Sequence, residues 1–335
     1  MKKKIFIVLV NFNNSSDSIE CLESLFKQDY DNYQILLVDN SPIDKYYNEL
    51  VSWASGKKEF SIKTNFSELV YPLCKKPMLY KNIYETDLDK GLYDEKLLIV
   101  KLKENKGFAA ANNIALKYIQ KQIGIDAIVW LLNNDTVVTS NAVRLLSESL
   151  DKMDSNVVYG TPLVDYDEPQ KIQAIGGIYN RFFGITTNAG SGKLYTERIN
   201  VNDYKTDYPV GASLLIHSNF LNNIGLMNEA YFLYFEELDW VQRAKIKGGG
   251  HKIINAFIVF HKQGSTTKLK KGQKNPITDS IAQKSKLVYA YNYNRNNIIS
   301  IKLFMGTVLV LFRLFKGNFK VIPNIYKLIF NSFGR

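Results

Sequence analysis

The sequence of 335 residues is poor in cysteine and histidine, with only Cys21 and Cys74 and three histidines. Two cysteines are too few for a disulfide framework and fit a reducing compartment. The chain also has no glycine-rich fingerprint after its first apolar run and no Walker lysine motif, which excludes two familiar phosphate-binding loops. If a nucleotide binds, a metal and side chains must therefore handle most of its phosphate charge.

Long uninterrupted hydrophobic runs are also missing. Lys302 and Arg313 interrupt the apolar segment Ile298–Phe315, and a second segment covers Val321–Phe330. Neither offers the ~18–20 clean apolar residues that a membrane-spanning helix needs. Near the start, Ile5–Val10 is too short for a signal peptide and lacks a small-residue cleavage site after it. It predicts a buried first strand instead.

Acidic residues are almost absent from the C-terminal part. Residues 265–335 hold 13 Lys and Arg against the single acid Asp279, whereas residues 1–264 hold 30 bases and 31 acids. A uniformly basic nucleic-acid binder would not show this split, so no nucleic-acid partner is expected. We expect residues 265–335 to form a basic amphipathic helical tail that lies on an anionic membrane surface through 298–330. The alternative is a helix pair that packs on the catalytic domain or on a second subunit, as in a homodimer.

The first 135 residues contain short apolar runs with helical patterns between them. Near-continuous Ile, Leu and Val are typical of parallel strands buried on both faces, and this order predicts a doubly wound α/β sheet, mostly parallel and flanked by helices. The expected strands are Ile5–Val10, Ile35–Val38, Leu97–Val100 and Ile128–Leu132, with helices at Ala109–Ile119 and Ser140–Met153.

The later half predicts further elements of the same domain. A Gly- and Thr-rich hairpin is expected over 171–195, a strand at Val210–Ile216, a helix at Glu236–Lys247 and a strand at Lys252–Phe260. Residues 44–96 are less regular, and beyond a helix near Tyr46–Trp53 they have no assigned role.

Each of the four expected strands ends in short polar residues. Because ligands of open α/β sheets bind beyond the carboxyl ends of the strands, these residues predict a pocket suited to a nucleotide. Asp135 offers a hard oxygen ligand for a magnesium or manganese ion, with substrate phosphates completing the shell. A helix N-cap remains the alternative role of this Asp. The four ends are Asn11-Phe12-Asn13, Asp39-Asn40-Ser41, Asn105-Lys106-Gly107 and Asn133-Asn134-Asp135.

Three carboxylates follow an apolar stretch in the second half. Glu236, Glu237 and Asp239 lie within four positions, and desolvation would raise their pKa values, as a general base requires. A helix N-terminus also favours acids, so that alternative stays open. His261 follows the last expected strand and suits a metal ligand or a phosphate contact, or else a surface or capping histidine.

These motifs together resemble the inverting family 2 glycosyltransferases of the GT-A fold. More narrowly they are similar to rhamnosyltransferase- and galactofuranosyltransferase-like members that build bacterial surface polysaccharides such as capsule. The resemblance covers about residues 4–300 and implies a GT-A catalytic domain over 1–264, with a nucleotide-binding half (1–135) and an acceptor half (136–264). It rests on Val10–Asn13, Val38–Ser41, Glu104–Ala109 with Asn112-Asn113, Leu132–Thr136, Phe232–Trp240, Arg243, His261 and Gly264-Ser265-Thr266.

The resemblance also implies residue roles. Asp39 would bond the base, and Asp135 matches the last acid of the Asp-X-Asp metal motif, with His261 as second ligand. Asn133 stands where the first acid often is. The catalytic acids would be Glu237 as base, Glu236 as its nearest competitor, and Asp239. The donor-sugar or acceptor pocket would involve Asp239, Trp240, Arg243 and Gly211, and the nucleotide pocket Val10, Asn11, Phe12, Asn13, Asp39, Asn40, Asn105, Gly107, Asn112, Asn133 and Asn134.

The implied reaction moves a sugar from dTDP-rhamnose, UDP-galactofuranose or another UDP-hexose to a hydroxyl of a lipid-linked saccharide. It would use Mg²⁺ or Mn²⁺, invert the configuration in one displacement, and run in the cytoplasm on the inner face of the cell membrane. Two other functions remain open. A sugar nucleotidyltransferase would normally carry a glycine-rich loop after its first strand. A catalytically inactive glycan-binding or scaffold subunit would tolerate loss of Glu237, Asp135 or His261, all of which are present.

Overall fold

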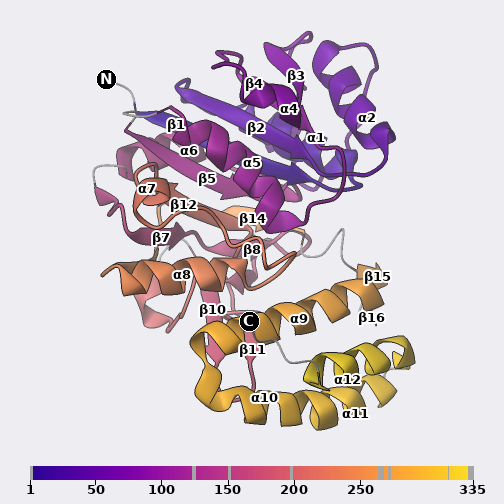
Figure 1. The fold of residues 1–335 in the computed structure, drawn as a ribbon. Helices are drawn as coiled ribbons and strands as arrows, with labels where there is room; N and C mark the ends of the chain where they lie inside the picture. Colours follow the sequence, from indigo (N-terminus) through magenta and orange to yellow (C-terminus); the bar gives the residue numbers. More distant parts are fainter. Residues whose placement is uncertain are drawn as a thin grey trace.

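A large mixed sheet forms the centre of the molecule (Figure 1). The computed structural model describes residues 3–122, 126–149, 152–196, 199–262, 268–270, 273–315 and 317–330. In this part of the chain the sheet has eight strands in the order β13-β7-β12-β5-β1-β2-β4-β3. They are β1 Lys4–Asn11, β2 Tyr33–Asp39, β3 Tyr80–Tyr84, β4 Leu97–Lys101, β5 Ala127–Leu132, β7 Val157–Gly160, β12 Ser213–His217 and β13 Gly250–Ile253.

The predicted mostly parallel α/β sheet flanked by helices is confirmed. Strand β12 runs antiparallel to β5 and β7, and the other neighbours in this sheet pair in parallel. The four apolar runs of the first half became β1, β2, β4 and β5. Because these four are parallel, their carboxyl ends meet at one edge of the sheet, called the carboxyl edge below.

Helices cover both faces of the sheet, which explains why the central strands are apolar throughout. Alternate residues of a strand point to opposite faces. In β1, Ile5, Ile7 and Leu9 join the core formed with α1, α2 and α6, whereas Phe6 and Val8 join the core formed with α5 and α8. The helices are α1 Ser15–Leu25, α2 Asp44–Ser55, α3 Ser67–Val70, α4 Glu85–Leu88, α5 Phe108–Gln120, α6 Ala142–Ser149, α7 Phe220–Asn223 and α8 Glu236–Ile246.

A smaller sheet lies beside the carboxyl edge. Its strand order is β6-β14-β8-β9. The hairpin predicted over 171–195 is confirmed as β10 and β11, which reach toward the C-terminal helices (Figure 1). The strands are β6 Thr136–Val138, β8 Leu163–Asp165, β9 Ile172–Ala174, β10 Gly176–Asn180, β11 Ile185–Ala189, β14 Val259–His261 and the short pair β15 Lys268–Lys270 and β16 Gln273–Lys274.

The prediction of one strand over Lys252–Phe260 is wrong. The segment forms β13 and β14, which belong to different sheets. Asn255 marks the break, and its side chain donates to the carbonyl of Ile199 (2.8 Å). The strand expected at Val210–Ile216 is β12, which begins three residues later at Ser213. The helix expected over Ser140–Met153 is α6, described over Ala142–Ser149, and residues 150 and 151 lie outside the described residues.

Residues 44–96 contain more regular structure than the sequence predicts. Helix α2 covers the expected Tyr46–Trp53 helix, and Tyr80–Tyr84 adds β3 at the sheet edge. Between them, the ring of Phe66 packs on those of Tyr166 and Phe260, with centroids 5.1 and 4.2 Å apart. This lobe therefore covers the smaller sheet.

The C-terminal helices gather at the end of the molecule opposite β3 and β4 (Figure 1). They have a core of their own, which includes Leu287, Ile301, Met305 and Ile325. The expected boundary at residue 264/265, with Gly264-Ser265-Thr266, lies outside the described residues. The helices are α9 Pro276–Tyr293, α10 Ile298–Phe304, a π-helical stretch Met305–Leu309, α11 Val310–Phe315 and α12 Ile322–Phe330.

No C-terminal segment offers ~18–20 uninterrupted apolar residues, but a criterion of length and overall composition tolerates two charged residues. In the described part of the chain, one helix meets that criterion, Arg295–Phe315, with 21 residues and a mean hydropathy of 2.1. It continues through α10, the π-helical stretch and α11 without a break. The buried carboxylate of Asp279 on α9 accepts two hydrogen bonds from Arg313 (2.8 and 2.6 Å), so this interrupting charge has a protein partner.

Candidate active site

The first polar cluster lies where β1 and β2 end side by side. Their register pairs Asn11 with Asp39, and both side chains are fully buried. Asn11 Nδ2 and Ser41 Oγ donate to Asp39 Oδ1 (2.7 and 2.6 Å), and Lys101 Nζ donates to Asp39 Oδ2 (3.0 Å). Both oxygens of this carboxylate therefore have donors, and Asp39 ties together the ends of β1, β2 and β4.

The same cluster extends to the end of β5. Ser18 on α1 donates to Asn11 Oδ1 (2.8 Å), and Asn134 Nδ2 donates to Ser18 Oγ (2.8 Å). Just beyond β1, Asn13 has a φ of 53°, in the left-handed region that Asn tolerates better than most residues. Its backbone N–H donates to Ser41 Oγ (2.8 Å). The carboxyl edge is thus a preorganised amide-rich surface, beside which Val10 and Phe12 are half-buried.

A second cluster shapes the loop after β4. Asn40 Nδ2 donates to Asn105 Oδ1 (2.9 Å), and the backbone N–H of Lys106 donates to Asn40 Oδ1 (2.8 Å). Gly107 has a φ of 83°, and a Cβ there would lie 2.5 Å from the carbonyl oxygen of Phe232. Glycine is therefore required for both conformation and space. The loop consequently contacts the segment that leads into α8.

Two neighbouring asparagines on α5 have different partners. Asn112, predicted near the nucleotide, is buried in α5 and donates to the carbonyl of Phe108 (2.9 Å). Asn113 Nδ2 donates to the carbonyl of Met227 (2.9 Å), and the N–H of Met227 donates back to Asn113 Oδ1 (3.0 Å). No role was predicted for Asn113, whose two hydrogen bonds join α5 to the loop before α8.

The third cluster joins Asp135 to His261 across the smaller sheet. His261 pairs with Thr136 in the β14–β6 register, and His261 Nε2 lies 3.1 Å from Asp135 Oδ1. On the other side of the ring, Gln173 Oε1 lies 2.6 Å from His261 Nδ1, while Gln173 Nε2 donates to the carbonyl of His261 (2.9 Å). The amide oxygen must accept here, so Nδ1 carries the proton. The other ring nitrogen, Nε2, then faces the Asp135 carboxylate.

This pair has the donor chemistry of a divalent cation site. Two acceptors 3.1 Å apart repel each other unless a proton or a cation lies between them. Gln173 fixes the tautomer and orientation of the ring, as the outer partners of metal-binding histidines do. Among the described residues, no group of three or more His, Cys, Asp or Glu is arranged to hold a metal. Asp135 and His261 therefore fit a site whose remaining ligands come from substrate phosphate and water.

The backbone before α8 is strained where the acids begin. Tyr234 and Phe235 have φ values of 68° and 72°, in a region that bulky residues rarely adopt. Such residues cost about 1–3 kcal/mol each and tend to occur at functional sites. Ser285 Oγ of α9 donates to the carbonyl of Leu233 (2.9 Å), which holds the segment in place. The turn directs Glu236 and Glu237 into the first turn of α8.

Burial raises the pKa of both carboxyls. For Glu236 the main cause is desolvation, with the neighbouring charge of Glu237 second; for Glu237 it is desolvation. The Oε2 atoms of both residues are buried and have no hydrogen-bond partner among the described residues. A carboxylate with a raised pKa and one oxygen that lacks a donor is a stronger proton acceptor than an exposed carboxylate.

Glu237 lines a cavity of about 460 Å³ between α8, β11 and the C-terminal helices. Gly211 lies beside the carboxylate, since a Cβ at this position would be 3.7 Å from Glu237 Oε1. Lys286 and Phe312 line the same cavity from α9 and α11. The C-terminal helices therefore form part of the surroundings of the candidate base.

Three residues predicted near the sugar contact the core of the domain instead of this cavity. Asp239 is fully buried and accepts from Arg243 Nε (2.7 Å) and Tyr293 OH (3.0 Å). Arg243 also donates to the carbonyl of Ile224 (2.8 Å), and Trp240 Nε1 donates to that of Gly225 (2.9 Å). Among the described residues that line the cavity, Asp239, Trp240 and Arg243 do not occur. Their side chains hold the loop before α8.

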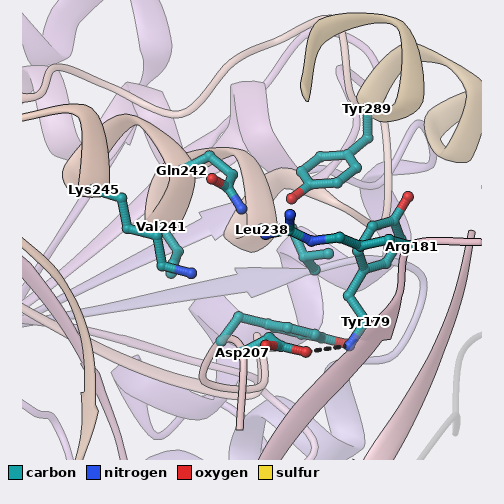
Figure 2. A pocket seen from close by; sticks show the side chains of 9 residues that line it. Tyr179, Arg181, Asp207, Leu238, Val241, Gln242, Lys245 and Tyr289 are labelled. Atoms are coloured by element: carbon teal, nitrogen blue, oxygen red, sulfur yellow. Dashed lines mark hydrogen bonds between the residues drawn. The ribbon is translucent and has the colours of Figure 1, made fainter. Parts of the chain in front are cut away.

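A second hollow lies on the other side of Leu238 (Figure 2). Figure 2 shows Arg181, Asp207, Gln242 and Lys245 around it, with the N–H of Tyr179 donating to Asp207 Oδ2 (2.8 Å). Its volume is about 20 Å³, enough for one water molecule but not for a sugar. The larger cavity at Glu237 is therefore the candidate substrate site.

Comparison with known proteins relates part of the chain to a described family. Residues 82–222 match the family described as Glycosyl transferase family 2. Over 148 residues the chain is 22% identical to the low-salt glycan biosynthesis hexosyltransferase Agl10 of Haloferax volcanii. That match covers 42% of this chain and 44% of the Agl10 protein, so it spans less than half of that relative.

Solved structures show a similar fold. GalNAc-T7, crystallised with UDP, GalNAc and Mn²⁺, has a TM-score of 0.52 and 13% identity, over 96% of this chain and 56% of that one. Residues 1–349 of S. aureus TarS in complex with UDP have a TM-score of 0.44 and 15% identity, over 97% and 90%, a likeness too low to carry an argument. The family model thus matches less than half of the chain, and the likeness to GalNAc-T7 shows a similar α/β fold.

Proposed function

We propose that the chain transfers a sugar from a nucleoside-diphosphate sugar to an acceptor hydroxyl with inversion of configuration. The observation that carries this proposal is Glu237, a half-buried residue with a raised pKa whose side chain lines the 460 Å³ cavity. The strained backbone at Tyr234 and Phe235 fixes its direction. Such a carboxylate suits proton abstraction from a hydroxyl.

In the proposed reaction Glu237 accepts the proton from the acceptor hydroxyl as that oxygen attacks the anomeric carbon. The bond from the anomeric carbon to the diphosphate oxygen breaks in the same displacement, which inverts the configuration. Glu236 is adjacent and buried, and its pKa is raised by desolvation and then by the charge of Glu237. We assign Glu236 a supporting role, because the cavity is lined by Glu237 and not by Glu236.

The carboxyl edge of the sheet would bind the nucleotide. Asn11, Asn13, Asn40, Asn105 and Asn134 lie together there, with Asp39 among them. Since both Asp39 oxygens already accept from protein donors, we propose that Asp39 orders the pocket and offers the base its remaining lone pairs. A pyrimidine donor, dTDP-rhamnose or a UDP-hexose such as UDP-galactofuranose, remains our proposal, and UDP is bound in the structure of GalNAc-T7.

Asp135 and His261 would hold a magnesium or manganese ion. The ion would neutralise charge that develops on the departing diphosphate. Asn133 replaces one acid of the usual motif, and its Nδ2 lies 3.5 Å from His261 Nε2. The nearby Lys262 forms ion pairs with Asp17 and Glu20, which raise its pKa although burial opposes them.

The acceptor is proposed to be a lipid-linked saccharide at the cytoplasmic face of the membrane. Residues 265–335 carry a net charge of +12, which suits an anionic surface. Large apolar side chains are exposed on the C-terminal helices, among them Ile299 (71%), Phe315 (87%) and Phe330 (81%). Exposed apolar residues between basic ones are typical of membrane-surface helices. The catalytic domain over 1–264 would thus be held at its acceptor by the helices that follow it.

A screen of nucleotide sugars tests the transfer reaction. The full-length protein with Mg²⁺ or Mn²⁺ should release nucleoside diphosphate from dTDP-rhamnose or from one of the UDP-hexoses. Release of pyrophosphate from a nucleoside triphosphate and a sugar phosphate would instead identify a nucleotidyltransferase. Glycan binding without release from any donor would identify an inactive scaffold subunit and overturn the proposal.

A further inference from the structure

Two phenylalanines are exposed at the tip of the β10–β11 hairpin, in the turn 181–184. Phe182 is 57% and Phe183 37% exposed, and the ring centre of Phe183 lies 5.1 Å from that of Phe304 on the helix Arg295–Phe315. We infer that this tip and the exposed side of that helix insert together into an anionic lipid surface, and that the helix lies along the surface without crossing it. The inference rests on the proposed attachment to the membrane and adds a contact that belongs to the catalytic domain.

The N–H groups of the tip find their acceptors within the hairpin. Those of Phe182 and Phe183 donate to Asn180 Oδ1 (3.0 and 3.1 Å). The N–H of Gly184 donates to the carbonyl of Asn180 (2.8 Å). Backbone groups that enter lipid must be satisfied by the protein, because no water is available there. A turn that stays in water has no such requirement, so this hydrogen bonding suits a tip that enters lipid.

Two carbonyls of the tip accept from the C-terminal helices, which joins the two apolar surfaces. Asn294 Nδ2 donates to the carbonyl of Arg181 (2.5 Å), and Ser300 Oγ donates to that of Phe182 (2.8 Å). Ile299 and Leu303 are 71% and 62% exposed and lie four positions apart, on one face of the helix. Because Ile299 directly precedes Ser300, this face adjoins the hairpin. The tip and the helix therefore present one continuous apolar surface.

The helix Arg295–Phe315 has the length and hydropathy of a membrane span, but protein contacts hold it near both ends. Ser300 bonds to the hairpin, and Arg313 bonds twice to Asp279 on α9. Crossing would carry one end of the helix, with its partner, to the other side of the bilayer. Only 28% of its most apolar window is buried inside the protein, so one side of the helix remains available to lipid. A helix of this kind lies in the membrane interface.

The charge around this surface favours anionic lipid over a second copy of the chain. Among the described residues of 276–330, Asp279 is the one acid, and it is buried and paired with Arg313. Two copies in contact would bring like charges together, whereas anionic headgroups attract basic side chains near the surface. The exposed or half-buried charged side chains in this range are all basic: Lys284, Arg295, Lys302, Lys320 and Lys327.

The hairpin also connects this surface to the candidate active site. Gly184 of the turn and Ile185, the first residue of β11, line the cavity at Glu237. A tip held in lipid would therefore hold this cavity close to the membrane.

The test compares Phe182→Ser with Leu79→Ser in the full-length protein. Both side chains are large, apolar and exposed (57% and 69%), but Leu79 directly precedes β3, at the other end of the molecule (Figure 1). Binding would be measured by sedimentation with vesicles of phosphatidylglycerol and phosphatidylcholine in equal amounts. Phe182→Ser should weaken it about 10-fold, because the variant loses the transfer of a phenyl ring from water into lipid. Leu79→Ser should leave it within about twofold.

Three further measurements complete the test. Leu303→Ser, on the helix side of the same surface, should weaken vesicle binding in the same direction, with an unfolding temperature close to that of the wild type. Vesicles of phosphatidylcholine alone should bind the wild type more weakly than the anionic vesicles do. Alkaline carbonate should release the full-length protein from the membranes of the cell that expresses it.

Equal effects of Phe182→Ser and Leu79→Ser, no binding of the wild type to anionic vesicles, equal binding to phosphatidylcholine alone, or retention after carbonate would each overturn the inference. So would a dimer in solution that Phe182→Ser dissociates while vesicle binding stays unchanged, since the surface would then belong to a second copy. Donor hydrolysis in solution needs no vesicle and tests the proposed transfer reaction separately.

Discussion

At the carboxyl edge of the sheet, the Asp39 carboxylate accepts hydrogen bonds from Asn11, Ser41 and Lys101. At the start of α8, the Oε2 atom of Glu237 is just as inaccessible but has no donor among the described residues. Asp39 is fully buried and Glu237 is half-buried, but each has at least one inaccessible carboxylate oxygen. The satisfied carboxylate is suited to hold a pocket in shape, whereas the unsatisfied one keeps a high proton affinity and is suited to chemistry.

Glu237→Gln gives the largest expected effect, because it removes the carboxylate whose Oε2 atom has no hydrogen-bond donor among the described residues. Transfer should fall about 10²–10⁴-fold, as losses of a general base typically do. Donor binding should persist, since the nucleotide contacts lie at the carboxyl edge. Initial rates with the active donor and calorimetric donor binding would check both parts, and normal turnover would assign the base elsewhere.

Lys101→Met removes one of the hydrogen-bond donors to the Asp39 carboxylate. The substitution leaves Asp39 buried without its cation, and removing one partner of a buried pair typically costs about 3–5 kcal/mol. Urea unfolding should show this loss, because Lys101 and Asp39 side chains are 7% and 0% exposed. The surface pair Lys121–Asp89, with exposures of 50% and 65%, supplies the control. If Lys121→Met destabilises as much, the pairing at Asp39 is not special.

Gln173→Leu tests the candidate metal site formed by Asp135 and His261. The change removes the partner of His261 Nδ1 while leaving Asp135 and His261 in place. Loss of such an outer partner typically lowers metal affinity about 10–100-fold. Thermal shift with UDP or dTDP and titrated Mn²⁺ would show a higher metal requirement for the variant. A wild type stabilised equally well without metal would contradict the assignment of this site.

Glu236→Gln has the smallest expected effect and concerns stability. The folded pKa of Glu236 is raised, so the folded protein binds more protons than the unfolded chain above the ordinary Glu pKa. Stability contributed by this group is therefore lost as pH rises from that value through the folded pKa. The variant should unfold at higher urea than the wild type at pH 8, with little difference at pH 4. A constant difference across this range would show that titration is not the cause.

The polar clusters could be predicted from the sequence because each residue lies directly after a predicted strand. Parallel strands end at one edge, so Asn11, Asp39, Asn105 and Asn134 could be grouped from strand order alone. The sequence could not show that both oxygens of the Asp39 carboxylate have hydrogen-bond donors. The donor to Oδ2 is Lys101, which lies 62 positions later in the chain. A lysine that ends a buried apolar run was the available signal.

The errors came from information that is not local. Lys252–Phe260 is apolar enough for one strand, and only the pairing partners of β13 and β14 separate it into two sheets. Gln173 carried no pattern that linked it to His261, 88 residues later. The resemblance implied Asp239, Trp240 and Arg243 for the sugar pocket. Because an α-helix turns 100° per residue, their side chains lie on other sides of α8 than Glu237 and bond within the domain.

The ion pair between Arg313 and Asp279 has a consequence for how the C-terminal helices could be altered. A buried, two-bonded pair fixes both the rotation and the axial position of a helix, as single polar contacts do in coiled coils. One residue inserted before Arg313 would turn the preceding part by about 100°, and four would move it by about 6 Å. The number of residues between Phe304 and Arg313 therefore determines which side chains of this helix face Glu237. Chimaeras that exchange these helices should preserve that spacing, whatever their sequence similarity.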